Sequence, residues 1–242
     1  MSTFIIPMAG LSSRFFTSGF NVPKYQLPIE NESMFAWSLS SFKRYFSKDY
    51  FLFIVRDIYD TPSFVHTECL RMGIESFHIC VLDRETKGQA ETVALGLKEL
   101  PESFDPDILI FNIDSQRKDY LKPDWINQYD GYLELFIAEG DHWSFAKLDI
   151  SNIVTSTAEK RRISQYASNG LYYFSNTSLF NEAYKDSLEN NKLEAGELYV
   201  APLYNYLIQK GYKIKGQIID EEVTQVAGTP EEYRKLVSGG KL

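Results

Sequence analysis

Short apolar runs alternate with amphipathic stretches through the first half of the chain. The stretches 33–46, 61–72 and 89–100 carry apolar residues at helical spacing. The apolar runs between them read Phe4–Ile6, Phe51–Val55, Phe77–Leu82 and Asp107–Ile113. Short apolar runs predict buried strands, and longer amphipathic stretches predict helices. The alternation therefore predicts βαβ units and a parallel sheet, and right-handed crossovers make this half Rossmann-like.

The pattern changes after Tyr120. Short strand-like runs with little helix between them cover residues 132–138, 144–148, 153–157 and 171–174, which indicates an antiparallel or mixed extension of the sheet. Helices are predicted near 178–189 and over 198–209, a strand over 212–219, and a last helix from Thr229, where Pro230 and Glu231 suit a first turn.

These elements predict an α/β fold, namely a Rossmann-like open mixed sheet flanked by helices. No linker or repeat divides the chain. Residues 1–242 are therefore expected to form a single domain, with a nucleotide-binding half over 1–120 and an acceptor-binding half over 121–242.

Charge and composition exclude several classes of protein. The net charge is −8, so a nucleic-acid partner is not expected. No apolar stretch approaches the ~20 residues of a membrane span, and the N-terminus lacks the features of a secretory signal, so the expected compartment is the cytoplasm. Cys69 and Cys80 have no metal-ligand spacing and are expected to be reduced core residues. A homodimer is left open.

The loop after the first apolar run is a candidate phosphate site. Small residues in Ala9-Gly10-Leu11-Ser12-Ser13 allow backbone N–H groups to point at phosphate oxygens. Arg14 offers a forked donor and Lys24 a point charge. The loop matches neither a Walker A nor a Gly-x-Gly-x-x-Gly motif. The alternative is an ordinary βα turn with two solvated cations.

Three later segments carry further candidates. Asp114 ends a buried strand, where a carboxylate is placed to hold Mg²⁺ or, alternatively, to cap the next turn. Gly88 and Gln89 suit contact with a base, or simply a helix N-terminus with a surface glutamine. Lys160 suits an acceptor phosphate, or belongs to a solvated charge cluster.

Sheet geometry predicts that several candidates meet. Ligands of open α/β sheets bind beyond the carboxyl ends of the strands. Residues 8–14, residues 83–89 and Asp114 all follow predicted strands. We therefore expect the three segments on one rim.

The order of the segments resembles the nucleotidyltransferase family that joins nucleoside triphosphates to sugar phosphates and related phosphorylated acceptors. That family includes hexose-1-phosphate uridylyl- and thymidylyltransferases and phosphocholine cytidylyltransferases. The resemblance covers nearly the full chain. It rests on Met8-Ala9-Gly10-Leu11-Ser12-Ser13-Arg14-Phe15 and Pro23-Lys24-Tyr25-Gln26-Leu27-Pro28-Ile29, followed in order by Gly88-Gln89, Asn112-Ile113-Asp114, Glu159-Lys160, Asn169-Gly170-Leu171-Tyr172-Tyr173-Phe174 and Gly228-Thr229-Pro230-Glu231.

The resemblance implies a role for each matching position. Asp114 would bind Mg²⁺, and Lys160, Gly170 and Glu197 would bind the acceptor. The catalytic cations would be Arg14, Lys24 and Lys160. The nucleotide would be held by Met8, Ala9, Gly10, Leu11, Ser12, Ser13, Gly88 and Gln89.

The activity that the resemblance implies is Mg²⁺-dependent transfer of CMP or UMP from CTP or UTP. The acceptor would be a sugar 1-phosphate or a similar small phosphorylated molecule, and pyrophosphate would be released. Pro7-Met8-Ala9-Gly10 looks more like the branch that serves capsule and other surface polysaccharides. The loop has fewer glycines than the sugar enzymes often have, and so a less permissive backbone.

One departure concerns the metal. Many members carry an aspartate where this chain has Val226, and valine cannot bind a metal. Either Asp114 and the triphosphate hold Mg²⁺ alone, or an acid from 220–222 substitutes, or the activity is altered.

Two rival functions remain at this point. A family-A glycosyltransferase shares the Rossmann-like half but should show Asp-x-Asp where this chain reads Asn112-Ile113-Asp114. A non-catalytic nucleotide-binding regulator would keep the fold without turnover. His66, His78 and His142 are isolated and are expected to be structural or solvated, which fits chemistry that needs no histidine base.

Overall fold

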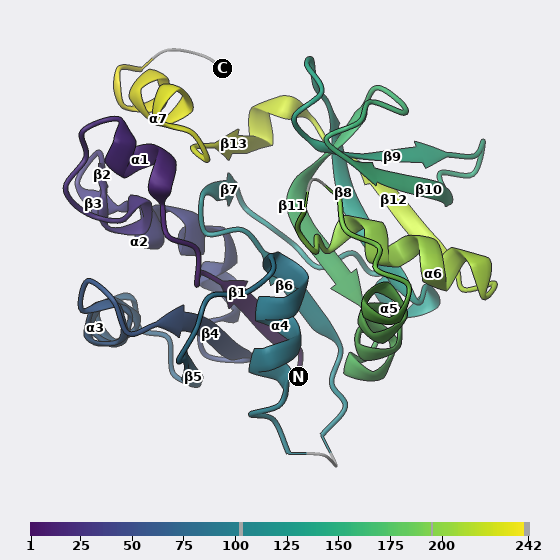
Figure 1. Ribbon diagram of the computed structural model, residues 1–242, viewed down its shortest axis with the longest axis horizontal. Coiled ribbons are helices and arrows are strands. Elements are labelled where there is room, and N and C mark those ends of the chain that lie inside the picture. The colour runs from purple at the N-terminus through teal and green to yellow at the C-terminus, as the bar shows by residue number, and fades with distance from the viewer. Residues whose placement is uncertain (102–103, 195, 240–242) are drawn as a thin grey trace.

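The computed structural model describes residues 1–101, 104–194 and 196–239. The predicted parallel sheet is confirmed, with strand order β6-β1-β4-β5. These strands are β1 (Thr3–Pro7), β4 (Tyr50–Arg56), β5 (Phe77–Leu82) and β6 (Ile108–Phe111). Helices connect them on both sides, so the first half is Rossmann-like (Figure 1).

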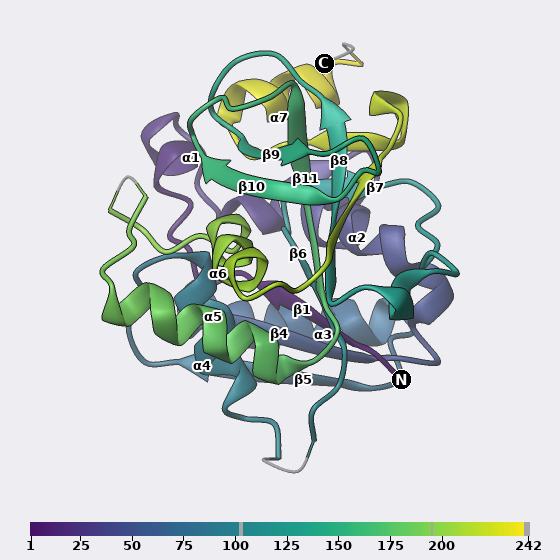
Figure 2. The ribbon, with the colours of Figure 1, turned by 90° about the vertical axis from the view of Figure 1, so that its right-hand side faces the viewer.

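Alternating side chains bury both faces of this sheet. Ile5, Leu52 and Ile110 pack on one face beneath α4 (Gln89–Leu97), α5 (Thr177–Glu189) and α6 (Tyr204–Gln209). Phe4 and Phe51 point to the opposite face, beneath α2 (Met34–Leu39) and α3 (Thr61–Met72). Figure 2 shows α5 and α6 on one side of the central strands and α2 on the other. Side chains alternate along each strand, which explains the continuous apolar runs of a doubly covered sheet.

The two cysteines belong to this core. Cys69 lies on α3 and Cys80 on β5, and both are free and buried. Burial raises the pKa of the Cys69 thiol to about 12 and that of Cys80 to about 11. The two thiols are therefore protonated near neutral pH.

The second half extends the same sheet. β11 pairs antiparallel with β6, β8 pairs with β11, and β12 pairs parallel with β8. The added strands are β8 (Gly131–Ile137), β9 (Ser144–Leu148), β10 (Val154–Glu159), β11 (Tyr166–Phe174) and β12 (Ile214–Ile218). The predicted mixed extension is therefore confirmed, and the sheet is continuous across residue 120.

β11 changes its neighbour partway along. Residues 171–174 pair with β6, but Ala167 pairs with Phe145 of β9, and the register with β8 shifts between Ser168 and Tyr172. Gly170 lies in this irregular stretch with φ +92°, and a Cβ there would lie 2.6 Å from Asn112 Nδ2. The irregularity therefore brings the backbone of β11 against the segment that follows β6.

Short elements from the beginning, middle and end of the chain complete the fold. They are α1 (Ser13–Thr17), the antiparallel strand pairs β2 (Pro28–Ile29) with β3 (Glu32–Ser33) and β7 (Ser115–Arg117) with β13 (Thr224–Val226), and α7 (Pro230–Val237). Tyr233 of α7 packs against Phe15 and Phe20, and its hydroxyl donates to Pro28 O at 2.7 Å. The end of the chain thus returns to its beginning (Figure 1).

One predicted helix was wrong at its start. Residues 198–200 are not helical, and a 3₁₀ turn η4 (Ala201–Leu203) precedes α6. Leu198 instead bonds the start of α4: its N–H donates to Lys87 O at 2.6 Å, and its carbonyl accepts from Ala90 N at 2.9 Å. Tertiary hydrogen bonds therefore override the apolar periodicity of this stretch.

The predicted helix boundaries at Ser33, Gly73 and Thr229 are confirmed, whereas α4 ends at Leu97 and not at residue 100. Ser33 accepts a hydrogen bond from Ala36 N, and Gly73 ends α3 with φ +75°. The stretch 33–46 divides into α2 and a 3₁₀ helix, and Thr229 caps α7 with Glu232 in a capping box. The remaining 3₁₀ helices are η1 (Lys24–Gln26), η2 (Ser40–Tyr45), η3 (Ile126–Gln128) and η5 (Glu221–Val223). Within the described ranges, no helix is long and apolar enough to cross a membrane.

Candidate active site

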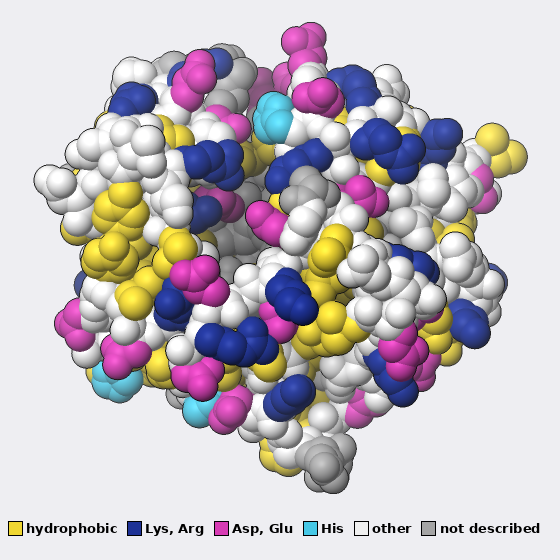
Figure 3. Space-filling model, in the orientation of Figure 1, with side chains coloured by type: hydrophobic (Ala, Val, Ile, Leu, Met, Phe, Trp, Pro, Cys, Tyr) yellow, Lys and Arg dark blue, Asp and Glu magenta, His cyan; other side chains and the backbone are white. Residues whose placement is uncertain are grey.

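A pocket of about 750 Å³ opens beyond the carboxyl ends of β1 and β6. Figure 3 shows it as a hollow with Lys, Arg, Asp and Glu side chains around its mouth. The three segments expected on one rim all contribute, through residues 8–14, residues 85–89 and Asp114. Every predicted site residue lines it: Met8, Ala9, Gly10, Leu11, Ser12, Ser13, Arg14, Lys24, Gly88, Gln89, Asp114, Lys160, Gly170 and Glu197.

The loop after β1 is tied to the segment that carries Lys24. Ser12 adopts a left-handed conformation with φ 54°, and its carbonyl accepts from Phe15 N at 2.9 Å as α1 begins. Its hydroxyl accepts from Lys24 N at 3.2 Å. Arg14 lies one residue into α1 and is exposed. One small loop therefore positions two cations at the pocket.

Lys24 and Asp114 form an ion pair in the pocket. Lys24 Nζ lies 2.6 Å from Asp114 Oδ2, and both side chains are partly exposed. The backbone of Asp114 is fixed by the C-terminal segment, because Ala227 N donates to Asp114 O at 2.8 Å. The carboxylate therefore has a defined place at the end of β6.

Space beside this carboxylate suits a cation. A Cβ at Gly228 would lie 3.0 Å from Asp114 Oδ2, so the glycine leaves that volume open. Val226 pairs with Ser115, the neighbour of Asp114, and lines the pocket without offering an oxygen ligand. Three acids of the described chain near η5 do not line the pocket, namely Asp220, Glu221 and Glu222.

The described residues contain no group of three or more His, Cys, Asp or Glu side chains that could hold a metal. Mg²⁺ is commonly held by one or two carboxylates plus substrate phosphates. Asp114 fits that pattern if phosphate oxygens complete the coordination.

The Gly88 turn packs closely against the backbone of Leu198. Gly88 has φ +127°, and a Cβ there would lie 2.6 Å from Leu198 O. Gln89 Nε2 donates to Asn112 Oδ1, so the glutamine side chain is held across the floor of the pocket rather than free on the surface. Asn112 thus contacts both the Gln89 amide and the Gly170 backbone position.

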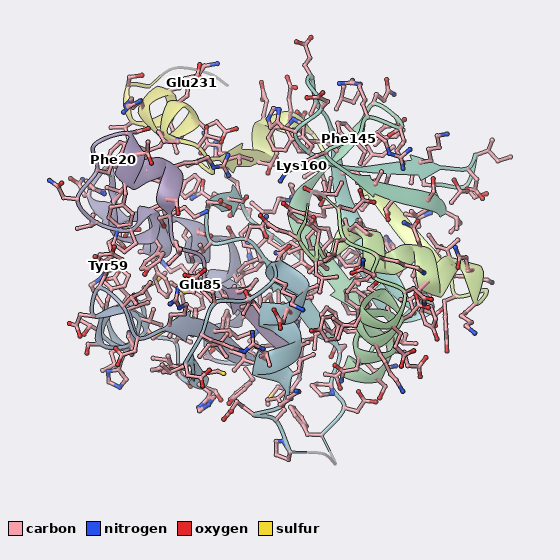
Figure 4. The ribbon with its side chains drawn as sticks, in the orientation of Figure 1. Phe20, Tyr59, Glu85, Phe145, Lys160 and Glu231 are labelled. Carbon is pink, nitrogen blue, oxygen red and sulfur yellow. The ribbon has the colours of Figure 1, made fainter. Side chains whose placement is uncertain are left out.

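Lys160 lies on the opposite side, at the end of β10. It has φ 49°, and its N–H donates to Trp143 O at 2.9 Å. Lys160 Nζ donates to the Tyr199 hydroxyl at 2.5 Å and lies 4.8 Å from the centre of that ring. Figure 4 shows Lys160 on the side of β9 and β10 and Glu85 on the side of α4.

Glu159 lies beside Lys160 and is 7% exposed. Burial raises the pKa of its carboxyl group, although the Ser144 hydroxyl donates to it and Lys160 is near. A buried carboxylate at this position offers a strong acceptor to hydroxyl or amine groups of a substrate.

A second buried carboxylate supports the irregular stretch of β11. Glu134 is 0% exposed and accepts from Asn169 Nδ2 at 2.9 Å and from Arg117 Nε at 2.8 Å. The Asn169 side-chain oxygen Oδ1 in turn accepts from Leu171 N at 3.0 Å. Burial raises the pKa of Glu134 despite the paired guanidinium. The network connects β7, next to Asp114, with the Gly170 side of the pocket.

Several pocket residues were not predicted as site residues. Asn112 and Glu159 belong to segments that the resemblance singled out, so a signal existed for them. His142 was expected to be structural or solvated; its side chain is 56% exposed, yet it lines the pocket and lies 3.9 Å from Glu232 Oε1. The others include Trp143, Ser144, Tyr172, Tyr199 and Glu232, whose places depend on loop and strand packing.

The site therefore presents cations on two sides of one pocket. Arg14 and Lys24 lie on one side and Lys160 on the other. This arrangement suits two anionic substrates that must approach each other.

Comparisons with known proteins agree with this architecture. The nucleoside-diphosphate-sugar pyrophosphorylase from Vibrio cholerae RC9 has a similar structure, with a TM-score of 0.93 and 45% identity over 97% of this chain and 99% of that chain. No family model matches the chain, and no curated protein does.

Two more distant structures share the fold. The UTP-bound UGPase from Acinetobacter baumannii has a TM-score of 0.72 and 12% identity, over 99% of this chain and 93% of that one. The inositol-1-phosphate CTP transferase from T. maritima has a TM-score of 0.73 and 11% identity, over 100% and 98%. The 45% identity to the Vibrio cholerae protein, over almost all of both chains, shows that this chain is a nucleotidyltransferase of the sugar-phosphate nucleotidyltransferase family.

Proposed function

We propose that the protein transfers CMP or UMP from CTP or UTP to a small phosphorylated acceptor, such as a sugar 1-phosphate. An oxygen of the acceptor phosphate forms a bond to the α-phosphorus of the nucleotide. The bond from the α-phosphorus to the bridging oxygen breaks, and its electron pair leaves with pyrophosphate. Both reactants are anions, so the protein must mainly position them and offset their charge.

The observation that carries the proposal is the placement of cations on two sides of one pocket. Arg14 and Lys24 are assigned to the triphosphate, and Lys160 to the acceptor phosphate. Gly170 and Glu197 are assigned to the rest of the acceptor. The loop from Met8 to Ser13 is assigned to the phosphates through its backbone N–H groups.

Gln89 and Gly88 are assigned to the base. The Gln89–Asn112 hydrogen bond orients the amide across the pocket, which leaves its carbonyl oxygen to accept from a base edge. The Gln89–Asn112 hydrogen bond therefore supports selection of the base through hydrogen bonding. CTP and UTP are the two nucleotides to compare.

We assign these roles to the two halves proposed from the sequence, with one exception. Pocket residues before 120 are assigned to the donor side, and pocket residues 142–199 to the acceptor side. Residues 226–232 come from the second half but lie beside Asp114, because α7 packs against α1. The donor half is therefore proposed to include this C-terminal segment.

Mg²⁺ is the proposed metal, with Asp114 as its protein ligand. The open volume at Gly228 supports this assignment. When bound, the ion would offset negative charge on the triphosphate and the departing pyrophosphate. Lys24, which contacts the same carboxylate, is proposed to act on the α-phosphate.

The proposed product is an activated precursor of a capsule or other surface polysaccharide, made in the cytoplasm. The support is the resemblance of Pro7-Met8-Ala9-Gly10 to that branch of the family.

The test is pyrophosphate release by purified protein with Mg²⁺, each of four nucleoside triphosphates, and a panel of sugar phosphates and other phosphorylated acceptors. Release is expected with CTP or UTP and one acceptor class. Lys160→Ala should raise the acceptor KM without changing nucleotide binding. Many members of the family have an aspartate where this chain has Val226, and the loss of that carboxylate gives weight to a non-catalytic regulator. Nucleotide binding without turnover across the panel would favour the regulator.

A further inference from the structure

We propose that Tyr199 is a positioning residue, which holds the Lys160 ammonium in the pocket at the place where the acceptor phosphate binds. The inference rests on the proposed function, since it names how the acceptor phosphate is recognised. Tyr199 is not part of the motif that carries the resemblance, and its role comes from its contacts with Lys160 alone.

Two contacts join the residues. The Tyr199 hydroxyl accepts from Lys160 Nζ at 2.5 Å, and the ammonium also lies 4.8 Å from the centre of the Tyr199 ring. A lysine side chain has four rotatable bonds and loses much entropy when it is held in one place. The hydrogen bond from one neutral side chain offsets part of that cost.

A neutral partner matters because the surroundings are acidic. Glu159 and Glu197 both act on Lys160 electrostatically, and both line the pocket. A tight ion pair with either carboxylate would neutralise the cation before a phosphate arrives. The phenol holds the ammonium in place without cancelling its charge, so the charge stays available to an anion.

The position of Tyr199 is itself fixed from the donor side. The preceding residue, Leu198, exchanges backbone hydrogen bonds with Lys87 and Ala90 at the start of α4. Gly88 lies so close to Leu198 that a Cβ would come within 2.6 Å of its carbonyl oxygen. The segment that holds the acceptor cation is therefore attached to the turn that we assign to the base.

The kinetic experiment compares wild-type protein with Tyr199→Phe. The substitution removes the hydroxyl but keeps the ring, so about a tenfold rise in the acceptor KM is expected. The kcat and the nucleotide KM should stay within about twofold, because nucleotide contacts and the reacting atoms are untouched. In a Lys160→Ala background, Tyr199→Phe should have no further effect on the acceptor KM.

Tyr206→Phe is the matched control. Lys210 Nζ lies 5.5 Å from the centre of the Tyr206 ring, outside the site pocket, so this variant removes a tyrosine hydroxyl beside another lysine and keeps its ring. This variant should leave all kinetic constants unchanged. A Tyr199→Phe variant that lowers kcat and raises both KM values alike, or that adds its full effect to Lys160→Ala, overturns the inference.

A second experiment does not depend on turnover. Acetic anhydride labels unprotonated amines, and mass spectrometry of peptides gives the labelling rate of Lys160 relative to Lys210. Tyr199→Phe should raise the relative rate at Lys160 several-fold, because the hydrogen bond to the phenol protects the amine. Tyr206→Phe should not change it. Unchanged labelling of Lys160 in Tyr199→Phe rejects the positioning role, whereas absent turnover in wild type alone rejects the proposed function.

Discussion

Lys24 Nζ lies 2.6 Å from Asp114 Oδ2, although 90 positions separate the two residues in the chain. The pair faces the pocket, where the proposed function gives its members different substrates: the α-phosphate for Lys24 and Mg²⁺ for Asp114. In the pair, each charge reduces the cost of holding the other in a partly buried place. When the substrates bind, the Lys24–Asp114 contact would be replaced by two ionic contacts, one between Lys24 and the α-phosphate and one between Asp114 and Mg²⁺.

Asp114→Asn tests the carboxylate with little change in shape. The variant should fold but lose at least about a hundredfold in kcat/KM for pyrophosphate release, because the amide cannot offset the charge of a metal. The measurement is steady-state kinetics together with thermal unfolding. Asp49→Asn is the matched control, since Asp49 Oδ2 lies 2.8 Å from Lys122 Nζ in a similar ion pair outside the pocket.

The control should lose stability and keep its activity per folded molecule. Equal loss of activity in both variants would show that the Asp114 carboxylate acts through folding alone.

Gly88→Ala should disturb both sides of the pocket. A Cβ would meet the Leu198 backbone, and φ +127° is a conformation that other residues rarely adopt. We expect a loss of stability above the ~1–3 kcal/mol of backbone strain alone, with higher KM values for nucleotide and acceptor. Urea unfolding and kinetics measure both.

Gly211→Ala separates strain from collision. Gly211 also has a positive φ, of +89°, but a Cβ there meets no heavy atom within 4 Å. This variant should show the strain without the changes in KM. Similar kinetics for the two variants would argue that Gly88 does not connect the two sides.

Val226→Asp should strengthen metal binding. The side chain of residue 226 lines the pocket, and its backbone pairs with Ser115 beside Asp114. A second carboxylate should lower the Mg²⁺ concentration for half-maximal activity several-fold. Mn²⁺ binding followed by electron paramagnetic resonance gives a readout without turnover.

Gln225→Asp is the control for added charge, because adjacent strand residues point to opposite faces and Gln225 does not line the pocket. Tighter Mn²⁺ binding in both variants would indicate a general charge effect instead of a ligand at position 226.

Glu159→Gln should change how stability depends on pH. Burial raises the pKa of Glu159 above its ordinary value of 4.5, so the folded protein holds that proton more tightly than the unfolded chain. The free energy of unfolding should therefore fall as pH rises from about 4.5 through the raised pKa, and this contribution is absent in the glutamine variant.

Urea unfolding at several pH values between about 5 and 7 measures the effect. The decline of wild type over this range should be steeper than that of Glu159→Gln. Glu134, whose pKa burial also raises, contributes equally to both proteins and cancels in the difference. Parallel curves would contradict the raised pKa of Glu159.

The fold was largely predictable because its signals are local. The run Phe51–Val55 is apolar because helices cover both faces of the sheet there, and it appears as β4. The run Phe77–Leu82 appears as the edge strand β5, which is less covered and exposes Val81. Segments without periodicity were missed. The paired strands β7 and β13 are too short to show a pattern. Residues 198–200 were predicted as helical from their apolar spacing, but Leu198 instead makes backbone hydrogen bonds to Lys87 and Ala90.

The segments that form the candidate site could be predicted from the sequence. Strand ends of a parallel sheet meet at one rim, so Arg14, Gln89 and Asp114 were expected together, and the pocket contains all three. Lys160 follows an antiparallel strand, so the strand-end argument did not place it on this rim; its residue type and the resemblance suggested it. Tyr199 and Trp143 carried no signal, since no local pattern tells which loop side chain will reach a distant lysine.

By itself, the sequence determined the parallel sheet, the rim on which ligands are proposed to bind, and the order of segments typical of a nucleotidyltransferase. These follow from periodicity and from residue types at strand ends. The tertiary structure alone decided that Lys24 pairs with Asp114, that Tyr199 holds Lys160, and that α7 returns to α1. Such contacts depend on how separately formed elements pack, and side chains far apart in the chain meet only when that packing is complete.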